Sequence, residues 1–272
     1  MLLKRFLVAI VLLPIGIAVI IAGGWYLTTL VAIFMGLAAW EYTTLFRAGG
    51  LHPASVLVIG GTLLLLIGRN LNGFEGAPWM ISLLILLSMT YHLVSYERGR
   101  DQAGTDFAVT LGGMFYIGWI GAYFVSLRNL PEGKWWMLVV LSAVMLADSA
   151  AYFIGKRFGR HHLSPRLSPK KTWEGYLGGI ILGVLLTAGF STILQMWAGA
   201  DSAITPLRGA LVGLAMGIFP TLGDLGESMI KRQVGVKDSG KILPGHGGAF
   251  DRVDSWLWAV VIGYYMVLWL WS

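Results

Sequence analysis

The chain has 272 residues, of which 56% are hydrophobic and only 12% carry a charge. Soluble globular proteins carry about 25% charged residues, so this composition excludes an ordinary soluble domain. The chain has no cysteine and a formal net charge of +6. Disulfides, thiolate nucleophiles and cysteine-ligated metals are therefore excluded.

Apolar blocks follow one another along the chain, each close to the length of about 20 residues with which a helix crosses a bilayer. They lack the alternating ten-residue pattern of a membrane β-barrel. We therefore expect an all-α polytopic membrane protein with about nine transmembrane helices. The expected spans are 6–23, 25–46, 54–69, 78–96, 106–127, 135–155, 174–198, 207–230 and 253–271. The first apolar run exceeds the h-region of a signal peptide, so we expect it to be retained.

Nine spans place the two chain termini on opposite sides of the membrane. With the N-terminus in the cytoplasm, 16 Lys and Arg residues fall on the cytoplasmic side and 4 on the other. This asymmetry satisfies the positive-inside rule. We expect a cytoplasmic N-terminus, a C-terminus on the opposite side and, without an organelle-targeting segment, a bacterial plasma (inner) membrane.

Polar groups are distributed unevenly between the two halves of the chain. The five spans in 1–134 carry few of them, and we expect Glu41 and His92 there to be packed or interfacial groups. The four spans in 135–272 carry most of the ionisable residues, together with two cytoplasmic loops at 156–173 and 231–252. We expect one integrated membrane domain whose C-terminal part is catalytic.

Glycines recur every four residues in two spans. Gly209, Gly213 and Gly217 do so in the eighth span, and Gly179 and Gly183 in the seventh. Small residues at this spacing let helices approach closely. Two interpretations stay open: packing within one helix bundle, and the contact face of a homodimer.

The eighth span ends in a polar face. Asp224, Glu227 and Ser228 are three and four residues apart, so on a helix they share one side. The negative end of the helix dipole lies there, so two carboxylates require a compensating positive charge. Lys231 and Arg232 supply one candidate, and a divalent cation is the other.

With a bound cation, Asp251 at the start of the last span would supply a third oxygen ligand. Oxygen ligands without cysteine favour Mg²⁺ over zinc. His246 alone does not make a zinc site. It lies between two glycine-containing pairs whose backbone N–H groups suit phosphate oxygens, and a solvated turn is the alternative interpretation.

The second polar region begins inside the sixth span, with Asp148, Ser149 and Tyr152. Asp148 is about two turns before Lys156, roughly 12 Å along a helix, and thus below the cytoplasmic interface. An aspartate at that depth faces a polar cavity or a partner.

The loop 156–173 ends in Lys170, Lys171 and Thr172, which offer two cations and a hydroxyl at the entry to the seventh span. Membrane anchoring on anionic lipid head groups is the simple interpretation of this basic loop, and substrate phosphate is the other. For Arg157, Arg160 and Arg166 we prefer anchoring.

Taken together, the residues describe one site at the cytoplasmic membrane surface. It has carboxylates for Mg²⁺, basic residues and a glycine turn for phosphates, and access to lipid. This combination suits phosphoryl or nucleotidyl transfer onto a lipid phosphate.

Several segments, in this order and spacing, resemble the signature of the phosphatidate cytidylyltransferase (CDP-diacylglycerol synthase) family. They are Ser228 to Arg232, Lys237-Asp238, Pro244 to Gly248 and Asp251 to Asp254, preceded by Ala147 to Tyr152 and Leu163 to Gly175. The similarity covers roughly residues 143 to 260, whereas the first half is similar only in being a run of spans. Ala249 departs from the larger aliphatic residue that is usual in the family, without touching a polar group.

The resemblance implies that CTP and phosphatidic acid give CDP-diacylglycerol and pyrophosphate, with Mg²⁺ and with one or two cations bound. It implies Mg²⁺ ligation by Asp224 and Asp251, helped by Glu227 and Asp148. The residues implied to hold phosphates are Lys231, Arg232, Lys237, Lys241 and Arg252 for the nucleotide, and Lys170, Lys171 and His246 for either substrate. Further residues implied to contact substrate are Ser149, Tyr152, Thr172, Ser228, Asp238, Gly247 and Gly248.

Other function classes remain as alternatives. A CTP-dependent lipid kinase would release CDP instead of pyrophosphate. A transporter would suit the spans and the intramembrane Asp148, but the polar groups gather at one face and no internal repeat is visible. A purely structural or lipid-binding role leaves Asp224, Glu227 and Asp251 unexplained. No nucleic-acid partner is expected.

Overall fold

The structure is a computed structural model that describes residues 13–236, 238–240 and 247–271. Eight helices in this part of the chain are long and apolar enough to cross a membrane. A shorter apolar helix, Leu13–Ala22, lies in the described part of the first expected span. The expectation of an all-α polytopic membrane protein is therefore confirmed, and the orientation of the termini stays a prediction.

The helical elements follow the expected spans closely. They are α2 (Gly24–Ala48), α3 (Ser55–Asn72), α4 (Ala77–Glu97), α5 (Ala103–Gly113), η1 (Met114–Trp119), α6 (Tyr123–Arg128), α7 (Gly133–Phe158), α8 (Trp173–Ala198), α9 (Pro206–Ile218), α10 (Pro220–Gln233) and α11 (Phe250–Leu270). The fifth span consists of α5, a π-helical segment and α6. The eighth span is divided into α9 and α10 at Pro220, which has no backbone N–H to continue the hydrogen bonding of α9.

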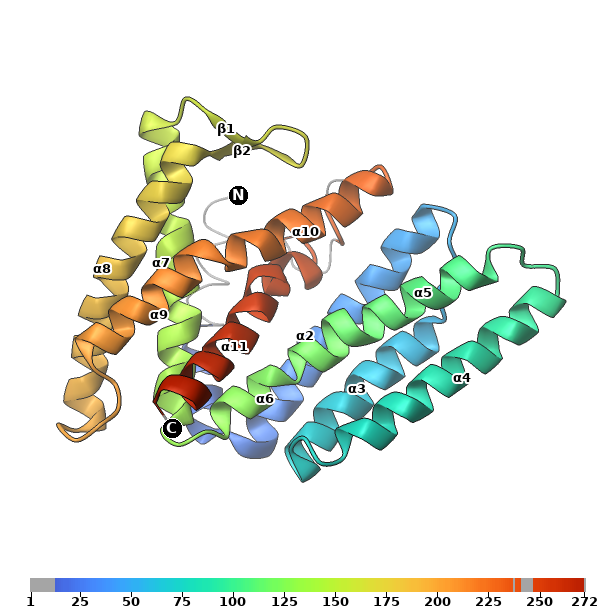
Figure 1. Ribbon diagram of the computed structural model, residues 1–272, viewed down its shortest axis with the longest axis horizontal. Coiled ribbons are helices and arrows are strands. Elements are labelled where there is room, and N and C mark those ends of the chain that lie inside the picture. Colours follow the sequence, from blue (N-terminus) through green and yellow to red (C-terminus); the bar gives the residue numbers. More distant parts are fainter. Residues whose placement is uncertain (1–12, 237, 241–246, 272) are drawn as a thin grey trace. The chain divides into compact units, whose positions relative to one another are not determined.

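The chain forms two compact units, and the boundary between them falls within α10 and α11. The first unit comprises 1–126 and 230–253, and the second 127–229 and 254–272. The expected division at residue 134 into two parts of one integrated membrane domain stays a prediction. In the first unit α2, α3, α5 and η1 pack together (Figure 1) around buried Met35, Val58, Leu66 and Ile117.

In the second unit α7, α8 and α9 lie side by side (Figure 1). Glycines permit the close approach of these helices. A Cβ atom on Gly179 would lie 2.8 Å from the Cβ of Ala151, and one on Gly213 would lie 2.8 Å from the carbonyl oxygen of Gly183. The glycine spacing thus serves packing within one bundle, and the homodimer stays a prediction.

The loop 156–173 contains a small antiparallel hairpin that was not predicted. Its strands are β1 (His162–Ser164) and β2 (Ser168–Thr172), and His162 pairs with Thr172. The hairpin connects the ends of α7 and α8 (Figure 1). Lysine and proline are poor strand formers, so the sequence gives little sign of it.

Candidate active site

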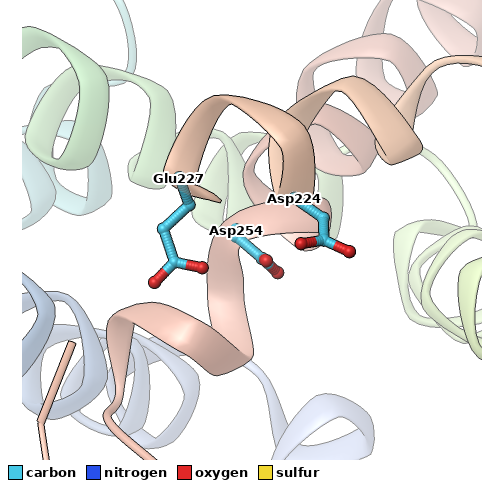
Figure 2. Close-up of side chains that lie close together, drawn as sticks. All are labelled: Asp224, Glu227 and Asp254. Atoms are coloured by element: carbon cyan, nitrogen blue, oxygen red, sulfur yellow. The ribbon is translucent and has the colours of Figure 1, made fainter. Parts of the chain in front are cut away.

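Three carboxylates gather where α10 meets α11 in the second unit (Figure 2). Asp224 and Glu227 come from α10 and Asp254 from α11, and one oxygen of each lies within 4.8 Å of the others. Glu227 and Asp254 are 1% and 8% exposed. Negative charges this close and this buried repel one another unless a positive group compensates. We call these three residues the acidic cluster.

Two features of the backbone bring the carboxylates of the acidic cluster together. Asp224 and Glu227 are one turn apart, so they share a face of α10. Gly223, immediately before them, lies so close to α11 that a Cβ atom there would clash with the carbonyl oxygen of Asp254. The close approach at this glycine sets Asp254 opposite the two carboxylates of α10.

The acidic cluster fits a hard divalent cation. Its ligands are all carboxylate oxygens, which Mg²⁺ prefers. Two ligands of one Mg²⁺ lie at most about 4.2 Å apart, twice the usual metal–oxygen distance. One carboxylate oxygen from each residue of the acidic cluster lies within 4.8 Å of the others, which is close to this value. A small movement of the side chains would therefore close the site around the ion.

A lysine and two further polar residues adjoin the acidic cluster. Lys171 Nζ, at the end of β2, lies 2.5 Å from Asp224 Oδ2. The Ser228 hydroxyl donates to Asp224 Oδ1 over 3.4 Å. Asp148, exposed on α7, interacts electrostatically with both Lys171 and Asp224. The structure therefore brings together five of the predicted residues and adds Asp254.

Hydrogen bonds to the first turn of α8 hold the hairpin that carries Lys171. Glu174, in the first turn of α8, accepts from the backbone nitrogens of Arg160 and His161 at 3.0 and 3.2 Å. It also contacts His161 Nδ1 at 2.5 Å. Thr172 Oγ1 caps α8 by accepting from the Gly175 nitrogen at 3.2 Å. These contacts fix both ends of the hairpin.

Asp251 takes part in a second polar cluster, within the first unit. Its Oδ1 lies 2.6 Å from Lys231 Nζ, and the two side chains are only 9% and 10% exposed. Its Oδ2 accepts from the Ser239 nitrogen, the Ser239 hydroxyl and the Gly248 nitrogen at 3.0, 2.9 and 2.8 Å. Asp251 was predicted to bind Mg²⁺ with Asp224, and that role stays a prediction.

Gly247 and Gly248 both contact Asp251. Gly247 has φ +82°, and a Cβ atom there would lie 2.8 Å from Asp251 Oδ2. The Gly248 N–H donates to Asp251 Oδ2, and its predicted role with a phosphate oxygen stays a prediction. Glycine at 247 is thus required both by the backbone conformation and by the close approach of the carboxylate.

The other predicted residues lie apart from these contacts or outside the described chain. Arg232 Nη1 donates to the Val236 carbonyl oxygen at 3.3 Å. Side chains that are exposed are those of Ser149, Tyr152, Lys170, Asp238 and Arg252. Residues outside the described part are Lys237, Lys241 and His246. The roles of all of these in substrate binding stay predictions.

Sequence reasoning missed Asp254. The sequence did offer Asp254 as a candidate, because it stands one helical turn after Asp251 in the segment Asp251 to Asp254. Choosing between them requires the packing of α11 against α10, which the spacing alone does not contain.

The fold and the acidic cluster define a polytopic membrane protein with a carboxylate site beside a lysine. Comparison with known proteins gives its family. The model of the family described as "Cytidylyltransferase family" matches residues 3–270. The chain is 35% identical to the phosphatidate cytidylyltransferase of Pseudomonas aeruginosa, covering 99% of this chain and 97% of that protein.

Two further relatives with the same name are equally complete matches. The Bacillus subtilis protein is 34% identical, covering 97% of both chains. The Synechocystis protein is 32% identical, covering 97% of this chain and 96% of its own. The chain belongs to the cytidylyltransferase family, and the resemblance found in the sequence is confirmed.

Proposed function

We propose that the protein transfers the cytidylyl group of CTP to phosphatidic acid, giving CDP-diacylglycerol and pyrophosphate for phospholipid biosynthesis. An oxygen of the lipid phosphate bonds to the α-phosphorus of CTP, and the bond from that phosphorus to the β-phosphate oxygen breaks. A phosphomonoester has a second pKa of about 6, so the attacking group is largely ionised at pH 7 without a strong general base. The observation that carries the proposal is the acidic cluster with Lys171 beside it.

We propose Mg²⁺ as the cofactor and the acidic cluster as its site. Asp224, Glu227 and Asp254 would hold it, and their all-oxygen chemistry supports this choice. When bound, Mg²⁺ supplies charge neutralisation at phosphate oxygens. The competing assignment is Asp251 as a Mg²⁺ ligand. The resemblance allows either one or two bound cations.

Lysines of the two clusters suit the phosphate groups of the substrates. Lys171 and Asp224 are 27% and 34% exposed, so Lys171 can exchange its carboxylate partner for an incoming phosphate. Lys231 is more enclosed and is oriented by Asp251. Positioning and charge neutralisation of this kind account for most of the catalysis of phosphoryl and nucleotidyl transfer.

We place the site on the cytoplasmic side of a bacterial plasma membrane. The excess of Lys and Arg in the loops 156–173 and 231–252 supports this orientation. The similarity to bacterial proteins supports the choice of membrane.

The test is product analysis on the full-length protein purified in detergent. With CTP, phosphatidic acid and Mg²⁺, we expect pyrophosphate and CDP-diacylglycerol in equal amounts. Omission of phosphatidic acid is the control and should abolish pyrophosphate release. Release of CDP in place of pyrophosphate would overturn the proposal in favour of a CTP-dependent lipid kinase.

A further inference from the structure

Glu41 is a carboxylate of α2 that is fully buried, at 0% exposure. Its hydrogen bonds come from the opposite end of the chain. Oε2 accepts from the Ser239 hydroxyl at 2.9 Å and from the Phe250 backbone nitrogen at 2.8 Å. Burying a carboxylate costs desolvation free energy. If position 41 served only helix packing, an apolar side chain there would be more stable.

Two glycines accommodate this carboxylate. A Cβ atom on Gly240 would clash with Glu41 Oε1, and one on Gly248 would clash with Oε2. The two glycines stand on either side of the segment 241–246. The chain before and after this segment is therefore held against the same side chain of α2.

Ser239 connects Glu41 to the second polar cluster. Its hydroxyl oxygen lies 2.9 Å from Glu41 Oε2 and also 2.9 Å from Asp251 Oδ2. A hydroxyl has one hydrogen and donates to one of them at a time, while the Ser239 backbone nitrogen holds Asp251 as well. Asp251 in turn pairs with Lys231. A continuous series of contacts thus leads from α2 to Lys231.

We propose that Glu41 is a positioning residue for nucleotidyl transfer. It fixes Ser239 and the first N–H of α11, and so orients Asp251 and Lys231 toward the phosphates of CTP. This inference rests on the proposed function. Being fully buried, Glu41 acts through these residues and does not touch substrate.

The proposed role requires an acceptor oxygen and no charge. Both hydrogen bonds end on Oε2, and Oε1 has no hydrogen-bond partner among the described residues. Glutamine can keep the two bonds with its amide oxygen and place its nitrogen where Oε1 lies. Glu41→Gln is therefore the conservative variant, and Glu41→Ala the disruptive one.

The first readout is the KM for CTP, which does not depend on the fraction of enzyme that is active. Full-length variants in detergent are assayed for pyrophosphate release. Loss of two buried hydrogen bonds in Glu41→Ala should raise the KM for CTP by about tenfold or more, with the KM for phosphatidic acid unchanged. Glu41→Gln should stay within about threefold of the parent. Ser239→Ala should raise the KM for CTP, and the Glu41→Ala/Ser239→Ala double variant should equal Glu41→Ala because both act through one series of contacts.

Asp106→Ala is the matched control. Asp106 is another buried carboxylate of the first unit, 1% exposed, and its oxygens accept from the His52 nitrogen at 2.7 Å and from Arg100 Nε at 2.8 Å. Its loss should lower thermal stability and leave the KM for CTP unchanged. A Glu41→Ala variant that behaves in the same way would overturn the proposal. So would a Glu41→Gln variant as impaired as Glu41→Ala or, where Glu41→Ala fails to fold, a Ser239→Ala variant with the parental KM.

The second readout does not need activity. Trypsin has sites in 232–252, and the rate of cleavage there reports how firmly this segment is held. Below the unfolding temperature, Glu41→Ala should be cleaved about tenfold faster than the parent, and Asp106→Ala at the parental rate. Equal rates in all three would overturn the positioning role. An inactive parent would overturn the proposed function instead, and cleavage would still test Glu41.

Discussion

The ammonium group of Lys171 lies 2.5 Å from a carboxylate oxygen of Asp224, although Lys171 lies in the second strand of the hairpin and Asp224 within α10. The adjacent Lys170 is exposed and has no ion pair among the described residues. Alternation along β2 explains the difference, because successive side chains of a strand point to opposite sides.

Replacing Lys171 by alanine should reduce kcat/KM for pyrophosphate release by roughly 10- to 100-fold, the usual effect of losing one charged contact. Lys170→Ala is the comparison, because it removes the same charge one residue away, and its loss of kcat/KM should be smaller than that of Lys171→Ala because only Lys171 pairs with Asp224. Steady-state kinetics of both variants check this. Equal losses in the two would show that only the net charge of the hairpin matters.

The acidic cluster predicts how the enzyme responds to metal. Chelation should abolish activity, and added Mg²⁺ should restore it. Asp254→Asn removes one ligand charge, so half-maximal activity should need about tenfold more Mg²⁺, with partial recovery at high concentration. Titration of activity against Mg²⁺ measures this.

Asp251→Asn is the comparison for that titration, since it disrupts the contact with Lys231 and leaves the acidic cluster intact. It should lower activity without changing the Mg²⁺ requirement. The reverse pattern, with the requirement shifted in Asp251→Asn and parental in Asp254→Asn, would establish Asp251 as the ligand.

The spans could be predicted because hydropathy over about 20 residues is sufficient to identify a membrane helix. The hairpin could not, since Lys170 and Lys171 are ordinary loop residues by composition, and the hairpin is closed by Glu174, which accepts from the Arg160 and His161 nitrogens. The choice of Asp254 depends on how α11 packs at Gly223. Ser239, which donates to Glu41, lies 198 residues away along the chain, and a single sequence carries no signal for a contact at that separation.

Gly223 predicts a stability effect with a clear control. A Cβ atom at this position has no room beside the Asp254 backbone, so Gly223→Ala should separate α10 from α11 and destabilise the fold by about 1–3 kcal/mol. Gly189→Ala in α8 has nothing within 4 Å of the added atom and should be neutral or stabilising by up to about 1 kcal/mol. Thermal unfolding in detergent measures both. Equal unfolding temperatures would contradict the close approach at Gly223.

The contacts of Glu174 with the start of the hairpin predict that these hydrogen bonds are needed for activity. Glu174→Ala removes the acceptor for the Arg160 and His161 nitrogens, which frees the start of the hairpin and with it the placement of Lys171. Activity should fall about tenfold, and trypsin should cleave faster at Arg160 and Arg166. Glu97→Ala, at an exposed glutamate that ends α4, is the control and should change neither. If Glu174→Ala lost activity with no faster cleavage, the carboxylate would act on substrate directly and not through the hairpin. If cleavage became faster while activity stayed at the parental level, the position of Lys171 would not depend on the Glu174 contacts.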